Sequence, residues 1–267
     1  MLSLLLGFVA PAQGALPAAD SLRLLHQLPQ PARYFTVDKL QQVYLVAQDN
    51  TVYKYDPYGK ELFVYNDNSR GQLAYIDATD PFNLLLFYPE LQAVVALDRT
   101  LNETAVLHLF SAGVLNASAI ARAVDNNIWV YDQAAFRLMK IGREHELLVG
   151  SDNLSAQLPT PPRAEQLIAQ GNLLYLNCPG QGVFVFDNFT QFHQLLPYPD
   201  AQRIQLANGQ LLLYEAEGVR FYKPETLQEG QMPKWGTEGA KQQYYYGKRY
   251  YELLQSGQVA VYNLKPD

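Results

Sequence analysis

Val183-Phe184-Val185-Phe186-Asp187 is one of six copies of a single strand pattern, and this repeat decides the fold. Each copy is a short apolar strand that follows another apolar strand and a tight polar turn. The copies end at Asp56, Asp98, Gly142, Asp187, Lys223 and Asn263. Successive end positions are 42, 44, 45, 36 and 40 residues apart. A period of about 40 residues, with four strands in each period, is typical of a β-propeller blade.

The sixth unit lacks one strand, and the start of the chain can supply it. Residues 22–28 form an apolar stretch of strand length that precedes the first repeat. If this stretch pairs with residues 259–262 as the outer strand of blade six, the ring closes and no long edge is left unpaired. No segment has a sustained helical period. The sequence therefore predicts an all-β, six-bladed β-propeller closed by its N-terminal strand. A twisted β-sandwich is the alternative, and it would not require six matching units.

Apolar runs also place the strands inside the blades. The inner strands of blades two and three are expected at residues 73–76 and 118–124. Blades four and five each show three apolar runs of strand length, so their outer strands are not assigned.

The first residues have the pattern of an export signal. Residues 4–9 are apolar, and residues 11–15 supply small side chains of the kind found at a cleavage site. We expect a signal peptide at residues 1–15 and a single domain at residues 16–267. The apolar run is too short to span a bilayer. No Lys or Arg precedes it, so a frayed apolar N-terminus is the alternative. The expected location is the periplasm or the extracellular space.

Charge and composition exclude some classes of partner. The net charge is −6 and the pI is about 5.2, with no block of Lys or Arg. A nucleic-acid surface normally requires a basic stripe, and an anionic membrane surface requires basic clusters. The sequence therefore predicts neither a nucleic-acid partner nor direct membrane insertion. Cys178 is the only cysteine, so no internal disulfide can form.

The histidines do not form a catalytic or metal-binding pattern. All four lie on or near predicted outer strands, and no pair has the spacing of zinc ligands. They are His26, His108, His145 and His193. No G-x-S-x-G motif is present. The sequence predicts no metal site, no cofactor and no catalytic residue, and it favours a non-enzymatic role.

Carboxylates are the alternative catalytic candidates. Asp38 and Asp77 are expected on inner strands, and other acidic residues are expected on loops beside the channel. A propeller hydrolase or lactonase would use such carboxylates for a divalent cation or for acid–base work. A lone Asp at a blade turn more often caps backbone amides.

Binding residues are expected on the loops between the second and third strand of each blade. These loops emerge together on one face around the channel, and a rigid scaffold concentrates contacts on its loops. They are short, which suits a flat docking face. The candidates are Asp49, Asn50, Tyr88, Glu90, Asp132, Gln133, Glu215, Glu217 and Gln258. A second possibility is sugar binding by Tyr244, Tyr245, Tyr246, Tyr250 and Tyr251, although alternation along two paired strands would bury about half of this cluster.

The segment Asp125-Asn126-Asn127-Ile128-Trp129-Val130-Tyr131-Asp132 resembles the strand pairs of six-bladed propellers of the NHL and TolB-like type. The blade pattern also resembles the small exported propellers of bacteria with a type IX secretion system, one of which plugs the periplasmic mouth of an outer-membrane translocon. This resemblance implies a protein-interaction module of the cell envelope, whose partner is another envelope protein such as an outer-membrane translocon.

Overall fold

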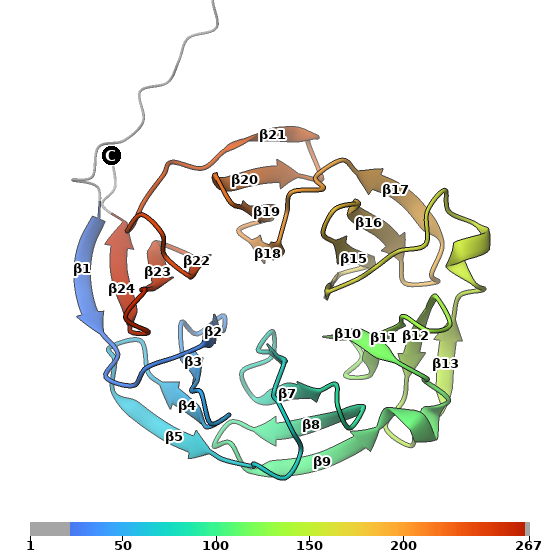
Figure 1. Ribbon diagram of the computed structural model, residues 1–267, viewed down its shortest axis with the longest axis horizontal. Coiled ribbons are helices and arrows are strands. Elements are labelled where there is room, and N and C mark those ends of the chain that lie inside the picture. The colour runs from blue at the N-terminus through green and yellow to red at the C-terminus, as the bar shows by residue number, and fades with distance from the viewer. Residues whose placement is uncertain (1–21, 265–267) are drawn as a thin grey trace, which may run out of the picture.

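The computed structural model describes residues 22–264 as six four-stranded antiparallel sheets. The sheets stand around a central channel as the blades of a ring, and the chain visits them in sequence order (Figure 1). This arrangement confirms the predicted six-bladed β-propeller and excludes the two-layer sandwich. The predicted signal peptide, residues 1–15, lies outside the described residues.

Every blade has the same strand order from the channel outward. The inner strands are β2 (Tyr34–Val37), β6 (Tyr75–Asp77), β10 (Ala117–Arg122), β14 (Gln166–Gln170), β18 (Arg203–Ala207) and β22 (Gln242–Tyr246). The second strands are β3 (Val43–Val46), β7 (Asn83–Tyr88), β11 (Ile128–Asp132), β15 (Leu173–Cys178), β19 (Gln210–Glu215) and β23 (Arg249–Leu253). The third strands are β4 (Val52–Tyr55), β8 (Ala93–Asp98), β12 (Arg137–Ile141), β16 (Gly182–Asp187), β20 (Gly218–Lys223) and β24 (Val259–Leu264).

The outer strands form the rim of the ring. They are β5 (Glu61–Tyr65), β9 (Glu103–His108), β13 (Leu147–Gly150), β17 (Phe192–Leu196), β21 (Gln228–Gln231) and β1 (Leu22–Gln27). Two short 3-10 helices, η2 (Leu109–Ala112) and η3 (Leu154–Ala156), lie in the links after blades two and three. Within residues 22–264, no helix has the length and apolar character needed to cross a bilayer.

The N-terminal strand closes the ring, as predicted. β1 pairs antiparallel with β24, with one bulge between Leu24 and His26 (Figure 1). Beyond β1, the backbone N–H of Leu28 donates to the carbonyl of Val259 at 2.8 Å, and the Leu28 side chain is fully buried. The edge of β24 is therefore paired, which removes a site for edge-to-edge association.

Two inner strands differ from the prediction at their ends. β6 begins at Tyr75, two residues later than expected, and Leu73 packs into the core beside it. β10 ends at Arg122, because the carbonyl of Ala123 closes a turn by accepting from the N–H of Asn126 at 3.0 Å. The expected strand end at Val124 is therefore wrong, and the Val124 side chain is 78% exposed.

The two faces of the ring carry different connections. The channel face carries the loops between second and third strands and the links between blades. The turn face carries the turns between first and second strands and between third and fourth strands. On the turn face, Oδ1 of Asp56 accepts from the N–H groups of Tyr58 and Lys60 at 2.8 and 2.9 Å. Equivalent pairs of bonds are made by Asp38, Asp98 and Asp187. The Asp that ends several copies of the strand pattern therefore caps a turn.

Glutamine amides join neighbouring blades by bonding to the backbone of the next blade. Gln92 accepts from the N–H of Ala117 at 2.5 Å and donates to the Ala117 carbonyl at 3.2 Å. Gln166 and Gln242 bind one backbone residue of blades five and one in the same way. Each glutamine amide thus pairs with both the N–H and the C=O of one inner-strand residue in the next blade.

Replacing Gln92 by alanine is expected to destabilise the protein by about 2 kcal/mol, because the buried N–H and carbonyl of Ala117 would lose their partners. Gln194→Ala, on the exposed outer strand of blade four, is the matched control, and its effect should stay within about 0.5 kcal/mol. Denaturant unfolding measures both changes. Equal losses in the two variants would contradict the proposed tie between blades.

The stability of the protein should depend on pH through His26, which lies in the closing strand β1. Burial, followed by the positive charge of Arg249, lowers the pKa of His26 below its ordinary value of 6.5, while Asp56 opposes the shift. The unfolded chain then binds the proton more readily than the folded chain. The contribution of neutral His26 is therefore complete above pH 6.5 and is lost as the pH falls through the folded pKa.

Acidification from about pH 7.5 to about pH 5.5 should lower the melting temperature, and His26→Gln should reduce this loss. His108→Gln, at the exposed end of β9, should keep the full pH dependence. Melting curves of the three proteins at both pH values give the comparison. An unchanged pH dependence in His26→Gln would show that another group is responsible.

Candidate functional site

A cavity of about 840 Å³ opens on the channel face between blades five and six. One wall is the loop at residues 215–218, between β19 and β20, and the other is the link at residues 233–241 that leads into blade six. Its inner end contains Arg33 and Arg203. Because Arg203 also lines the axial channel, the cavity joins the channel mouth.

The two arginines at the inner end are held in defined positions. Nη2 of Arg33 donates to Oδ1 of Asn50 at 2.9 Å and also to a carbonyl of blade two. Nη2 of Arg203 donates to the carbonyl of Gln243, and its guanidinium lies 3.9 Å from the ring centroid of Tyr214. Burial raises the pKa of Tyr214 to about 12, against the opposing effect of Arg203, so the stacking ring is neutral. A guanidinium has five N–H donors, so each arginine retains donors beyond those used to anchor it.

Glu252 in β23 holds the link at residues 233–241 in place through hydrogen bonds. The buried carboxylate accepts from the N–H and hydroxyl of Thr237 at 2.7 and 3.0 Å, and from the hydroxyls of Tyr250 and Tyr262 at 3.3 and 2.6 Å. Gly236 has a φ of 83°, and a Cβ atom there would overlap the Tyr250 hydroxyl. Only glycine fits this position, and the cavity wall is therefore built on fixed contacts.

The predicted binding residues separate into three groups. Glu215 and Glu217 line the cavity between blades five and six. Asp49, Glu90 and Gln258 lie on other channel-face loops and are at least partly exposed. The remaining four have structural contacts, and they are Asn50, Tyr88, Asp132 and Gln133.

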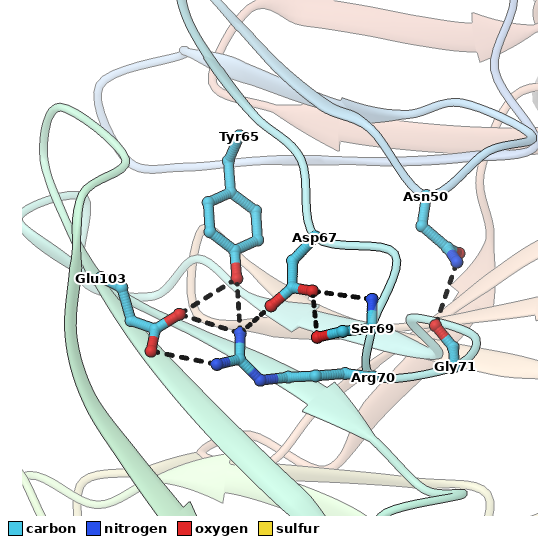
Figure 2. A network of polar contacts seen from close by, with 7 residues as sticks. All are labelled: Asn50, Tyr65, Asp67, Ser69, Arg70, Gly71 and Glu103. Atoms are coloured by element: carbon cyan, nitrogen blue, oxygen red, sulfur yellow. Dashed lines mark hydrogen bonds and ion pairs between the residues drawn. The ribbon is translucent and has the colours of Figure 1, made fainter.

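Asn50 belongs to a polar network between blades one and two (Figure 2). Its Nδ2 donates to the carbonyl of Gly71 at 3.0 Å. In the same network, the guanidinium of Arg70 binds Glu103 through two N–H groups at 2.8 and 3.1 Å and also pairs with Asp67. The network joins the first two blades, so Asn50 acts in the scaffold.

Asp132, Gln133 and Tyr88 are also used within the scaffold. Asp132 is the last residue of β11 and is fully buried, whereas the sequence placed it on a loop. Its carboxylate accepts four backbone N–H groups at 2.7 to 3.2 Å. Gln133 donates to the carbonyl of Pro162 at 3.0 Å in the link to blade four. Tyr88 is fully buried in the core between blades one and two.

Three of the carboxylates considered for catalysis, Asp38, Asp49 and Asp77, accept from nearby backbone N–H groups. Oδ1 of Asp77 accepts from the N–H and hydroxyl of Thr79, and Oδ2 accepts from the N–H of Arg122. Asp49 accepts from the N–H of Thr51 at 3.1 Å, and Asp38 caps a turn as described above. Among residues 22–264, no group of three His, Cys, Asp or Glu side chains could hold a metal ion. The four histidines lie on outer strands or, for His145, in the turn before β13.

The tyrosine cluster is divided between the cores and the axial channel. Tyr245, Tyr250 and Tyr251 are buried between blades, whereas Tyr244 and Tyr246 line the channel. The expected alternation is therefore present. The channel encloses about 430 Å³, and Tyr34 and Tyr75 contribute to the same wall.

The turn face displays apolar side chains that sequence reasoning missed. Tyr58 is 83% exposed, and Leu40, Phe82 and Phe189 are also exposed at turns of this face. Each of these four follows a capping Asp by two residues, and the Asp carboxylate accepts from its backbone N–H. Exposed Val124 lies on the turn after β10. The sequence could have predicted this exposure, because each of the four is an apolar residue two positions after a turn Asp, where a polar residue is usual.

Comparisons with known proteins identify the fold only. No protein family matches the chain, and no curated protein matches it. Virginiamycin B lyase from Staphylococcus aureus, solved as an inactive variant with quinupristin, has a TM-score of 0.65 at 12% identity, over 91% of this chain and 99% of that one. The Pan2 WD40 domain of Neurospora crassa has a TM-score of 0.61 at 10% identity, over 95% and 98%. A chain of the mitotic checkpoint complex has a TM-score of 0.60 at 7% identity, over 99% of both. Since these neighbours include an enzyme and a component of an assembly, the function must be argued from the surface.

Proposed function

We propose that the protein is an exported, non-enzymatic interaction module of the cell envelope that docks onto another envelope protein. A β-propeller is consistent with a protein-interaction module. The resemblance to small exported propellers supports an accessory role in an outer-membrane secretion or translocation complex. The expected signal peptide supports export to the periplasm or beyond.

The observation that carries this proposal is the apolar display on the turn face. Leu40, Phe82 and Val124 lie on the turns between the first and second strands of blades one, two and three. Each of these turns follows an inner strand, and the three blades are consecutive in the ring. Exposed apolar side chains are typical of protein–protein contact sites. The channel face also exposes Leu91, Phe110 and Leu115, so the test below compares the two faces. Because hydrogen bonds fix the turns, little conformational entropy is lost when a partner binds.

The test is a pull-down of the tagged protein from its native envelope, with the eluted proteins identified. A triple variant, Leu40→Ser, Phe82→Ser and Val124→Ser, should lose the partner that the unchanged protein retains. The control carries Leu91→Ser, Phe110→Ser and Leu115→Ser, which change three exposed apolar residues of the channel face.

The two variants also decide which face docks. If only the channel-face variant loses the partner, the docking site lies on the channel-face loops, as the sequence predicted. Recovery of the unchanged protein only as a free monomer would contradict the interaction module itself.

A further inference from the structure

The cavity between blades five and six is lined by charged side chains that do not pair with each other. Four are basic, Arg33, Arg203, Lys234 and Lys241, and three are acidic, Glu215, Glu217 and Glu238. Within residues 22–264, none of these seven side chains forms an ion pair. Charges of both signs that share one cavity and remain unpaired favour a ligand that carries both signs itself.

The two signs are partly separated along the cavity. Arg33 and Arg203 lie at the inner end beside the channel mouth, and both are anchored through Nη2. Glu215 and Glu217 lie on the loop of blade five. The inner end of the cavity is therefore basic, and a guanidinium group is a donor that suits a carboxylate. A cationic group would face the blade-five loop.

The uncharged part of the cavity suits a peptide backbone. The side chains of Tyr214, Trp235 and Tyr245 contribute apolar surface, and the rings of Trp235 and Tyr245 lie 5.3 Å apart. Gln202 and Gln243 also line the cavity, and an amide side chain can donate to and accept from a peptide backbone. The volume of about 840 Å³ lies in the range of small-molecule sites, roughly 300–1,000 Å³.

We infer that this cavity binds a short zwitterionic peptide. Its terminal carboxylate is held by Arg33 and Arg203, and its terminal ammonium group faces Glu215 and Glu217. This site lies on the channel face and does not depend on docking through the turn face, so either proposal can fail without the other.

Calorimetric titration of the intact protein with triglycine tests the inference. Triglycine should bind, and both triglycine amide, which lacks the carboxylate, and acetyl-triglycine, which lacks the ammonium group, should bind at least about tenfold more weakly. Inorganic phosphate is the third probe, and it should bind no better than the blocked peptides. Equal binding of free and blocked peptides, tighter binding of phosphate, or no binding of triglycine at millimolar concentration would each overturn the proposal.

Variants assign the two ends of the ligand. Arg203→Gln should weaken triglycine about tenfold and leave triglycine amide unchanged, because the amide has no carboxylate to lose. Arg99→Gln, on an exposed turn of the opposite face, is the matched control and should change neither affinity. Glu217→Gln, on an exposed loop where folding is not at risk, should remove the preference for triglycine over acetyl-triglycine. Full affinity and full preference in both cavity variants would refute the assignment.

Discussion

Proline at both Arg23 and Leu24 is expected to lower the melting temperature by roughly 10 °C, because it breaks the strand that closes the ring. The two residues pair with Asn263 and Tyr262 of β24. In an antiparallel ladder, one of any two consecutive residues directs its N–H at the partner strand. Replacing both therefore removes at least one ladder bond and leaves part of the β24 edge unpaired.

The bulge in β1 provides a matched control. Leu25 lies between the paired residues Leu24 and His26 and has no partner in β24. Because proline is tolerated at bulges, Leu25→Pro should have a much smaller effect. Leu24 and Leu25 are similarly exposed, 50% and 41%, so loss of apolar burial cannot explain a difference between the variants.

Size-exclusion chromatography supplies a second measurement for the double variant. An exposed strand edge favours association with another chain, so the variant should elute partly as a larger species. A melting temperature equal to that of the Leu25→Pro control, with a purely monomeric profile, would show that the ring does not depend on β1.

The sequence predicted the parts of this fold that are set by local apolar pattern. The third strands are short apolar runs with mostly buried side chains, so their positions were predictable from the repeat. The closing strand β1 is partly or fully exposed along its length, and it was predictable because an apolar run of strand length precedes the first repeat. The outer strands β17 and β21 were not assigned, because most of their residues are exposed and their sequences show little alternation. An outer strand is defined by the backbone of its neighbour, which a single segment cannot reveal.

The candidate site was less predictable, because it depends on contacts between distant segments. Asn50 and Gln133 are polar residues on channel-face loops, as a binding site would require, yet they bond to the next blade. Their partners are separated from them by about 20 to 30 residues, so no local pattern distinguishes a scaffold amide from a binding amide. The sequence placed Glu215 and Glu217 on the correct loop. The opposite wall, residues 233–241, was not predictable, because its position depends on a hydrogen bond from Thr237 to Glu252 in another segment.

Glu252→Ala is expected to cost about 3 kcal/mol or more of stability, because it removes the acceptor shared by several buried donors. The carboxylate is fully buried, and within the described residues it forms no ion pair. Burial, together with the hydrogen bond to Glu252, raises the pKa of Tyr262 well above its ordinary value, so this phenol remains a donor. Without the carboxylate, the N–H and hydroxyl of Thr237 and the hydroxyl of Tyr262 lose their acceptor, whereas the Tyr250 hydroxyl can still donate to the carbonyl of Trp235 at 3.3 Å.

Glu252→Gln separates the role of the acceptor from that of side-chain volume. The amide retains one acceptor oxygen but places an NH2 donor against groups that also donate, so its loss of stability should lie between those of the unchanged protein and Glu252→Ala. Glu225→Gln, on the exposed turn before β21, is the control and should be nearly neutral. Denaturant unfolding gives the order of the four proteins.

Triglycine titration of Glu252→Gln then connects stability to the cavity. Since Thr237 belongs to the link that forms one wall, loosening its clamp should weaken binding of the free peptide even while the protein remains folded. Stability equal to the unchanged protein in Glu252→Ala would show that the carboxylate does not hold the link. In that case another contact must position the link beside Tyr245.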